Sequence, residues 1–222
     1  MEISFWKERW DKGEIGFHQE HINPYLGYFY GEKGPAHEAR SKLRVFVPLC
    51  GKSRDLWWLM NNGYATVGVE CSELAVEDFF NEHQIEYRRS ELRSHVHYAA
   101  DNLEILMGDF FSITREEVGK ITDIFDRASL VALPEEMRRD YVEKMTELQD
   151  PGTRTLLITL TYPHGDMNGP PFSISKEEVE DLYGTHFSID KLVAKNVIDD
   201  EPGLKSRGLT ELTETAYKLT RK

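Results

Sequence analysis

The sequence predicts an α/β fold with a mostly parallel sheet, because strand-like and helix-like segments alternate from residue 43 to about residue 160. Such alternation is typical of βαβ units with right-handed crossovers. After residue 184 two strand-like runs follow each other, which predicts an antiparallel pair at the edge of the sheet. The first 40 residues do not fit the alternation and are expected to form a helical cover. We therefore expect one domain, with a cover at 1–40 and an α/β core at 43–222.

The strands are predicted from short runs of apolar, β-branched and aromatic residues that end at turn or polar residues. Runs of this kind fit strands that are buried on both faces of a parallel sheet. Four of them are clear: 43–49, 66–70, 103–107 and 155–161. A shorter run at 123–126 is flanked by charge, and the antiparallel pair is predicted at 187–198 and 209–219.

The helices between these strands are predicted from their ends and from apolar residues at helical spacing. Ser72 and Ser175 stand where N-cap residues are favoured, and Glu178 follows Ser175 at the spacing of a capping box. Gly63 is placed to end one helix, and Pro134 suits the first turn of another. The predicted helices are 53–62, 72–84, 134–148 and 175–183.

The composition argues against several classes of protein. Lys and Arg total 27 and Asp and Glu total 39, so the net charge of −12 argues against binding to nucleic acids or anionic membranes. No apolar run approaches the roughly 20 residues of a membrane-spanning helix, and the first residues lack the features of a signal peptide. Two cysteines are too few for a disulfide scaffold. We expect a cytoplasmic protein.

Residues that follow the predicted strands mark a candidate ligand site, because ligands bind beyond the carboxyl ends of the strands in open α/β sheets. Gly51 follows the first strand, and Glu70 ends the second strand 19 positions later. That spacing places a carboxylate to accept hydrogen bonds from both ribose hydroxyls of an adenosine cofactor. The alternative is an exposed strand-end carboxylate. A carboxylate that faces a ligand is expected to contribute little to the core.

Two further features restrict the chemical identity of the ligand. After the third strand, Asp109 could accept from an adenine amino group with Phe110 against the ring, or Asp109 could cap a helix instead. The triplet at 51–53, Gly-Lys-Ser, suggests a phosphate-binding loop, but Phe46 stands where the first glycine of that motif belongs. Because the glycines that bind a diphosphate are missing, the pattern argues against NAD and favours S-adenosylmethionine, and hence a methyltransferase.

Longer motifs occur along nearly the whole chain, and two of them are more specific than a general methyltransferase pattern: Pro48-Leu49-Cys50-Gly51-Lys52 and Gly169-Pro170-Pro171-Phe172. The others are Phe5-Trp6-Lys7-Glu8-Arg9-Trp10, Gly16-Phe17-His18, Val67-Gly68-Val69-Glu70, Asp126-Arg127-Ala128 and Leu130-Val131-Ala132. On these motifs the sequence resembles the thiopurine S-methyltransferase family. The resemblance implies a class I, Rossmann-like methyltransferase with an N-terminal helical cover. It implies methyl transfer from S-adenosylmethionine to aromatic and heterocyclic thiols, including thiopurines, with S-adenosylhomocysteine as the product.

The resemblance also implies roles for particular residues. Phe17 would lie between cofactor and substrate, and the segment with Arg207 would border the acceptor pocket. Vertebrate relatives carry an aromatic residue near position 207, so the acceptor is less well defined than the cofactor. The cofactor contacts that the resemblance implies are Trp6, Trp10, Leu49, Glu70, Arg127 and, by a looser match, Asp109. The guanidinium of Arg127 could bind a carboxylate or an anionic acceptor, or it could pair with a neighbouring aspartate.

The expected chemistry is an in-line displacement, which requires alignment of the reacting atoms and exclusion of water. Trp6 and Trp10 are four residues apart on one helical face, where they could pack in the core or cover a sulfonium cation. Aromatic thiols ionise substantially near neutral pH, so no catalytic base is expected. No metal site is expected either, because the one histidine pair at ligand spacing lacks an evident third ligand. His95 and His97 lie in a polar stretch and are expected in solvent.

Three alternatives stay open. Relatives of this family are associated with methylating selenium and tellurium compounds, and a cationic pocket with Arg127 and Arg207 would suit oxyanions. A catalytically silent module that binds S-adenosylmethionine is a second alternative, and an NAD-dependent oxidoreductase, which the missing diphosphate loop disfavours, is a third. For the leading interpretation we expect a monomer that acts on a small-molecule thiol.

Overall fold

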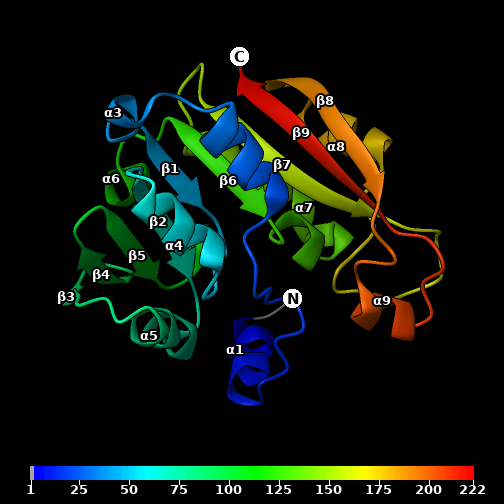
Figure 1. Cartoon of the computed structure of the whole chain (residues 1–222), viewed down its shortest axis with the longest axis horizontal. Coiled ribbons are helices and arrows are strands. Elements are labelled where there is room, and N and C mark those ends of the chain that lie inside the picture. The colour runs from blue at the N-terminus through cyan, green and yellow to red at the C-terminus, as the bar shows by residue number, and fades with distance from the viewer. Residues whose placement is uncertain (1–2) are drawn as a thin grey trace. The chain divides into compact units, whose positions relative to one another are not determined.

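The chain forms two compact units in the computed structural model, which describes residues 3–222 (Figure 1). The N-terminal unit extends to Phe125, and the C-terminal unit runs from Asp126 to Lys222. The boundary falls inside strand β6 (Asp123–Arg127). Over residues 3–222, no helix is both long enough and apolar enough to cross a membrane.

The N-terminal unit is built on a sheet whose central strands are parallel. The strands lie in the order β3-β4-β5-β2-β1-β6. Strand β2 (Ala65–Glu70) pairs in parallel with β1 (Arg44–Val47) and β5 (Leu103–Met107), and β1 pairs in parallel with β6. These strands confirm the predicted runs at 43–49, 66–70, 103–107 and 123–126, with small shifts at their ends. Their parallel direction brings Gly51, Glu70 and Asp109 to the carboxyl edge of the sheet.

An antiparallel hairpin beyond β5 was not predicted. It consists of β3 (Arg88–Glu91) and β4 (Val96–Ala100), and β4 pairs with β5. Every residue of β3 is exposed, so the sequence there lacks the apolar pattern from which strands are predicted. Charged side chains on such an edge strand discourage pairing with another chain.

Predicted helices of the N-terminal unit follow β1 and β2. Helix α4 (Arg54–Asn61) begins at Ser53, whose side chain accepts from the backbone N–H of Asp55, and it contacts β2. Helix α5 (Glu73–Glu82) begins at Ser72, as predicted, and contacts β2 and β5. The 3₁₀ turn η2 (Phe110–Ser112) and the short helix α6 (Arg115–Val118) follow β5.

The segment before β1 contains α1 (Ile3–Asp11), α2 (Pro24–Leu26), the π-helical turn η1 (Gly27–Glu32) and α3 (His37–Arg40). Its two halves are held differently. Tyr30 in η1 is buried, donates to the carbonyl of Ile124 at 3.4 Å and accepts from the Tyr64 hydroxyl at 2.6 Å through its own carbonyl. Helix α1 contacts α5, and its buried residue is Trp10. The second half is therefore part of the core, whereas the first half lies against α5.

The C-terminal unit contains an antiparallel set of strands in the order β7-β9-β8, namely β7 (Arg154–Thr161), β9 (Thr213–Arg221) and β8 (Phe187–Asn196). This arrangement confirms the predicted antiparallel pair at the end of the chain. Helices α7 (Glu135–Glu147) and α8 (Lys176–Tyr183) confirm two predicted helices. The 3₁₀ turn η3 (Leu130–Ala132) and the short helix α9 (Pro202–Ser206) complete this unit.

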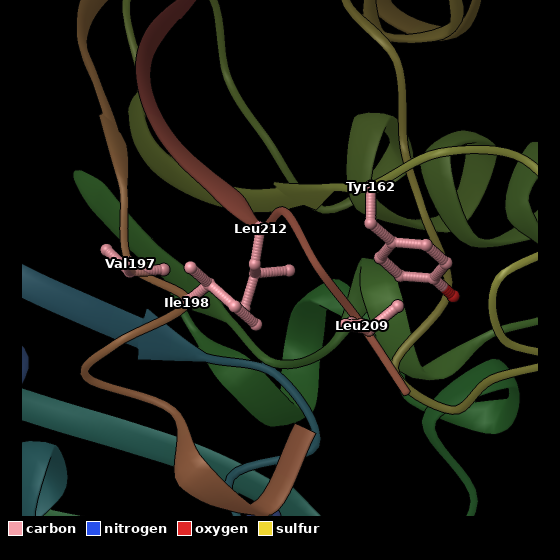
Figure 2. Packing of buried hydrophobic residues seen from close by; sticks show 5 residues of the cluster. All are labelled: Tyr162, Val197, Ile198, Leu209 and Leu212. Atoms are coloured by element: carbon pink, nitrogen blue, oxygen red, sulfur yellow. The ribbon is translucent and has the colours of Figure 1, made fainter. Parts of the chain in front are cut away.

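A small apolar cluster holds the loop that carries α9. Figure 2 shows its five buried members converging from the ends of β7, β8 and β9: Tyr162, Val197, Ile198, Leu209 and Leu212. The hydroxyl of Tyr162 donates to the carbonyl of Pro171 at 2.8 Å. The cluster thus joins the α9 loop to the Gly-Pro-Pro-Phe segment at 169–172.

Candidate functional site

The turn after β1 is strained and closely tied to β2. Leu49 and Gly51 have φ values of 44° and 51°, in the left-handed region. For a residue other than glycine this conformation costs on the order of 1–3 kcal/mol, and such strain is concentrated at functional sites. The N–H of Cys50 donates to the carbonyl of Val69 at 2.9 Å, which fixes the turn beside the end of β2.

Glu70 bridges this turn and the start of α5. Its side chain is 5% exposed. Oε2 accepts from the N–H of Gly51 at 2.8 Å, and Oε1 accepts from the N–H of Ser72 at 2.8 Å and from the thiol of Cys71 at 3.4 Å. Burial raises the pKa of the Glu70 carboxyl, and the backbone hydrogen bonds from Ser72 and Gly51 oppose that rise. The expectation that this carboxylate contributes little to the core is therefore wrong.

The Glu70 carboxylate still has capacity for a ligand. An ionised carboxylate offers about four acceptor positions, and a thiol is a weak donor. Backbone N–H groups and the Cys71 thiol occupy these positions, and a ligand hydroxyl could replace the thiol. The donor and acceptor pattern of two adjacent ribose hydroxyls fits this carboxylate.

The Gly-Lys-Ser triplet at 51–53 does not fit a phosphate. The N–H of Gly51 donates to the Glu70 carboxylate, which would repel an anion. The ammonium of Lys52 pairs with Asp78 at 3.1 Å and Glu82 at 2.5 Å, and the Ser53 hydroxyl caps α4. All three groups are thus engaged within the protein, which disfavours a phosphate-binding loop at this triplet.

An aromatic cluster covers the glycine turn. A Cβ atom on Gly51 would lie only 3.1 Å from the ring of Trp10, so glycine is needed there both for its φ and for this contact. The ring centroid of Phe17 lies 5.5 Å from Trp10 and 5.7 Å from Trp6, and both pairs are edge to face. The structure therefore brings Trp6, Trp10 and Phe17 together, and it places Trp10 on the turn that Glu70 holds.

Asp109 lies beside Glu70, because the N–H of Gly108 donates to the Glu70 carbonyl at 2.8 Å. Oδ1 of Asp109 accepts from the N–H of Phe111 at 3.0 Å and caps the 3₁₀ turn, which was the alternative role. Phe110 is 3% exposed and packs edge to face on Phe111, so its ring presents little surface in this conformation. The structure thus places the Asp109 carboxylate at the sheet edge and the Phe110 ring in the core.

His95 was expected in solvent but is 3% exposed, so that expectation is wrong. Its Nε2 lies 3.1 Å from the carbonyl oxygen of Asp109. His97 is partly buried, and its Nε2 lies 2.8 Å from Glu104. Sequence reasoning missed His95 because the hairpin that carries it has no apolar alternation at β3.

The remaining predicted site residues belong to the C-terminal unit. Arg127 is the last residue of β6, and Ala128 after it has a φ of 61°, a second strained strand end. The neighbouring Asp126 is fully buried and accepts from the Tyr141 hydroxyl at 2.8 Å, and burial raises the pKa of the Asp126 carboxyl to about 6. Arg207 is exposed and donates to the carbonyl of Pro170 at 3.0 Å.

Several solved structures with a similar fold are methyltransferases. The chain is similar to an S-adenosylmethionine-dependent methyltransferase from Anabaena variabilis, with a TM-score of 0.65, 13% identity and coverage of 99% of this chain and 95% of that one. It is also similar to magnesium protoporphyrin IX methyltransferase from Synechocystis with bound S-adenosylmethionine, with a TM-score of 0.62, 13% identity and coverage of 99% and 97%. The fold is therefore the Rossmann-like fold of S-adenosylmethionine-dependent methyltransferases, as predicted.

The family follows from closer relatives. The family model described as "Thiopurine S-methyltransferase (TPMT)" matches residues 1–222. Proteins named thiopurine S-methyltransferase from Nitrosospira multiformis and Marinobacter nauticus are 42% identical over 219 residues and 41% identical over 224 residues. The alignments cover 99% and 100% of this chain and 98% and 100% of those proteins. The chain belongs to the thiopurine S-methyltransferase family.

Proposed function

We propose that this chain transfers a methyl group from S-adenosylmethionine to the sulfur of aromatic and heterocyclic thiols, including thiopurines. The observation that carries the proposal is the buried Glu70 carboxylate, tied to Gly51 beneath the ring of Trp10. This arrangement suits a ribose next to a cation and does not suit a diphosphate. Membership of the family supports the cofactor and the thiol acceptor.

Each predicted residue has a role in holding the cofactor. Glu70 would accept from the ribose hydroxyls and Asp109 from the adenine amino group. Leu49, within the strained turn, would contact the cofactor. Arg127 would bind the carboxylate of the amino-acid end, because a guanidinium forms bidentate pairs with carboxylates. Phe110 would support the adenine from within the core. When bound, S-adenosylmethionine supplies a methyl group on a positively charged sulfur.

The protein's task in the reaction is to align the acceptor and to exclude water. The rings of Trp6 and Trp10 would attract the sulfonium charge, and Phe17 between them would separate cofactor from substrate. A dry site strengthens these electrostatic contacts. The acceptor needs no protein base, because an aromatic thiol is already substantially ionised near neutral pH. Arg127 and Arg207 would favour the thiolate over the neutral thiol.

Several expectations about the whole protein form part of the same proposal. Residues 1–40 would act as the cover and 43–222 as the core of one functional domain. The protein would be a cytoplasmic monomer without nucleic-acid or membrane partners. Light scattering after size-exclusion chromatography tests the monomer, and cell fractionation tests the location.

The function is tested by binding and then by turnover. Calorimetry should show binding of S-adenosylmethionine and S-adenosylhomocysteine and no binding of NAD. Radiolabelled methyl transfer should then be fastest with thiopurines and thiophenols and slower with selenite and tellurite. Binding without transfer to any acceptor would indicate a silent module, and preferential transfer to the oxyanions would contradict the thiol acceptor.

A further inference from the structure

We propose that His95 is a positioning residue for the adenine end of the cofactor site, acting through the main chain of Asp109. This inference rests on the proposed function, because it assumes that Asp109 contacts adenine. His95 precedes β4, on the hairpin that the sequence did not predict, and no sequence motif points to it.

The first support is steric. A Cβ atom on Gly108 would lie 2.4 Å from Cδ2 of His95, closer than real contacts allow. The imidazole therefore occupies the space that a side chain at position 108 would fill. Gly108 is also the residue whose N–H donates to the Glu70 carbonyl, so His95 packs directly on the link between the ends of β2 and β5.

The second support is the hydrogen bond to the turn. The Asp109 carbonyl can only accept, so Nε2 of His95 carries the proton and donates to it at 3.1 Å. This bond fixes the plane of the peptide that joins Asp109 to Phe110. Fixing that plane restricts ψ of Asp109, and the Asp109 side chain itself accepts from the N–H of Phe111 at 3.0 Å, so both halves of the residue are held.

The third support is that the imidazole is itself held on its other side. With the proton on Nε2, Nδ1 accepts from the Ser94 hydroxyl at 3.0 Å, and Oε1 of Glu117 lies 3.2 Å from Nδ1 on the same side. Glu117 is fixed in turn, because its Oε2 accepts from the N–H and the hydroxyl of Thr114, both at 3.0 Å. The ring thus bridges the capped start of α6 and the turn after β5, and its orientation is determined from both ends.

The experiment compares two substitutions at His95 with the same two at His97. His95→Leu removes the donor, whereas the amide of His95→Gln can still donate to the Asp109 carbonyl. His97 is the matched control, because it lies two residues further along the hairpin and bonds Glu104 at 2.8 Å rather than the turn. Calorimetry measures the affinity for S-adenosylhomocysteine and for its analogue with a 6-oxo group in place of the 6-amino group. The fitted stoichiometry corrects for any unfolded fraction.

We expect His95→Leu to raise the Kd of S-adenosylhomocysteine about tenfold, because a displaced Asp109 would lose its hydrogen bond to the adenine amino group. The preference for the 6-amino over the 6-oxo compound should shrink in this variant. His95→Gln should stay within about threefold of wild type and keep the preference, as should both His97 variants. In turnover, the KM for S-adenosylmethionine should rise in His95→Leu while kcat stays the same.

The outcomes separate this inference from the proposed function. If wild type binds S-adenosylhomocysteine and folded His95→Leu binds it as tightly with an unchanged 6-amino preference, the inference is overturned and the function stands. An equal loss in His95→Leu and His95→Gln would also overturn it, because the donor would then be irrelevant. If wild type binds neither S-adenosylmethionine nor S-adenosylhomocysteine, the proposed function fails and the inference fails with it.

Discussion

At the scale of single residues, Glu70 has a structural role, beside the binding role that we propose for it. Its two oxygens accept from the N–H groups of Gly51 and Ser72, so the carboxylate fixes the turn after β1 and the start of α5. In the proposed function, the same carboxylate accepts from the ribose hydroxyls of the cofactor. A ligand would therefore meet a group that is already oriented, which lowers the ordering cost of binding.

We predict that Glu70→Gln weakens cofactor binding and also lowers stability, each by roughly 1–3 kcal/mol. The amide of glutamine has one acceptor oxygen, so one of the two backbone N–H groups loses its partner. Calorimetry with S-adenosylhomocysteine measures the first effect, and denaturant unfolding of the apoprotein measures the second.

The control for this variant is Glu73→Gln, in the first turn of α5, whose carboxylate is half exposed and accepts from the Tyr98 hydroxyl. It should change cofactor affinity little. Unchanged affinity in Glu70→Gln would mean that the ribose does not bind at this carboxylate.

At the scale of elements, the two halves of the segment before β1 are held in the fold by different contacts. Helix α1 contributes Trp10 to the aromatic cluster over the glycine turn, whereas η1 is anchored in the core through Tyr30. Leu26, just before η1, has no exposed surface. The part that could open over a ligand is therefore residues 3–20, and the part that follows is structural.

We predict that deleting residues 1–20 leaves a folded protein, whereas deleting residues 1–32 unfolds it. The shorter deletion removes the rings of Trp6, Trp10 and Phe17, so methyl transfer should fall by orders of magnitude and cofactor affinity should fall too. Circular dichroism and thermal unfolding report the fold, and the radiolabel assay reports activity. Full activity in the shorter deletion would remove any catalytic role for this segment.

Hydrogen exchange gives an independent test of closure over the ligand. Residues 3–20 should gain protection when S-adenosylhomocysteine binds, while 23–32 should be protected in both states. Equal protection of residues 3–20 with and without ligand would rule out a cover that orders on binding.

At the scale of the whole molecule, each unit contains a buried carboxyl with a raised pKa. Burial raises the pKa of Glu70 in the N-terminal unit and raises that of Asp126 to about 6 in the C-terminal unit. A carboxyl whose pKa is higher in the folded than in the unfolded state stabilises the fold when it is protonated. Both groups therefore make stability fall as the pH rises.

We predict that Asp126 alone lowers the free energy of unfolding by about 2 kcal/mol as the pH rises from 4 to 6, since its pKa is 3.8 in the unfolded chain and about 6 in the fold. The contribution is complete only well below the unfolded pKa and is lost above the folded pKa. Denaturant unfolding of wild type and Asp126→Asn across pH 4–7 measures it as the difference between the two curves.

The control is Asp199→Asn, because Lys205 holds the pKa of the exposed Asp199 carboxyl below its ordinary value. The contribution of Asp199 to the change of unfolding free energy with pH should be small and of opposite sign. If the free energies of unfolding of wild type and Asp126→Asn differed by a constant amount over this pH range, the pKa of the Asp126 carboxyl would not be raised.

Much of the fold was predictable because each buried strand is a short run of apolar and β-branched residues, which is visible in the local sequence. The run at 103–107 coincides with β5, and the runs around β1, β2 and β7 differ from the observed strands by a few residues at most. Serine caps set the starts of α4, α5 and α8 for the same reason, since a cap acts within three residues. The β3–β4 hairpin escaped prediction because an exposed edge strand needs no apolar face.

By itself, the sequence determined the α/β fold class and the placement of Gly51 and Glu70 at the carboxyl ends of the first two strands. Both depend on spacing along the chain, which the periodicity of strands and helices converts directly into position. Only the tertiary structure decided that Glu70 is a buried bridge, that Trp10 lies on Gly51 and that His95 holds the turn at Asp109. Those contacts join segments far apart in the chain, and they depend on packing and on the removal of water, which no local pattern encodes.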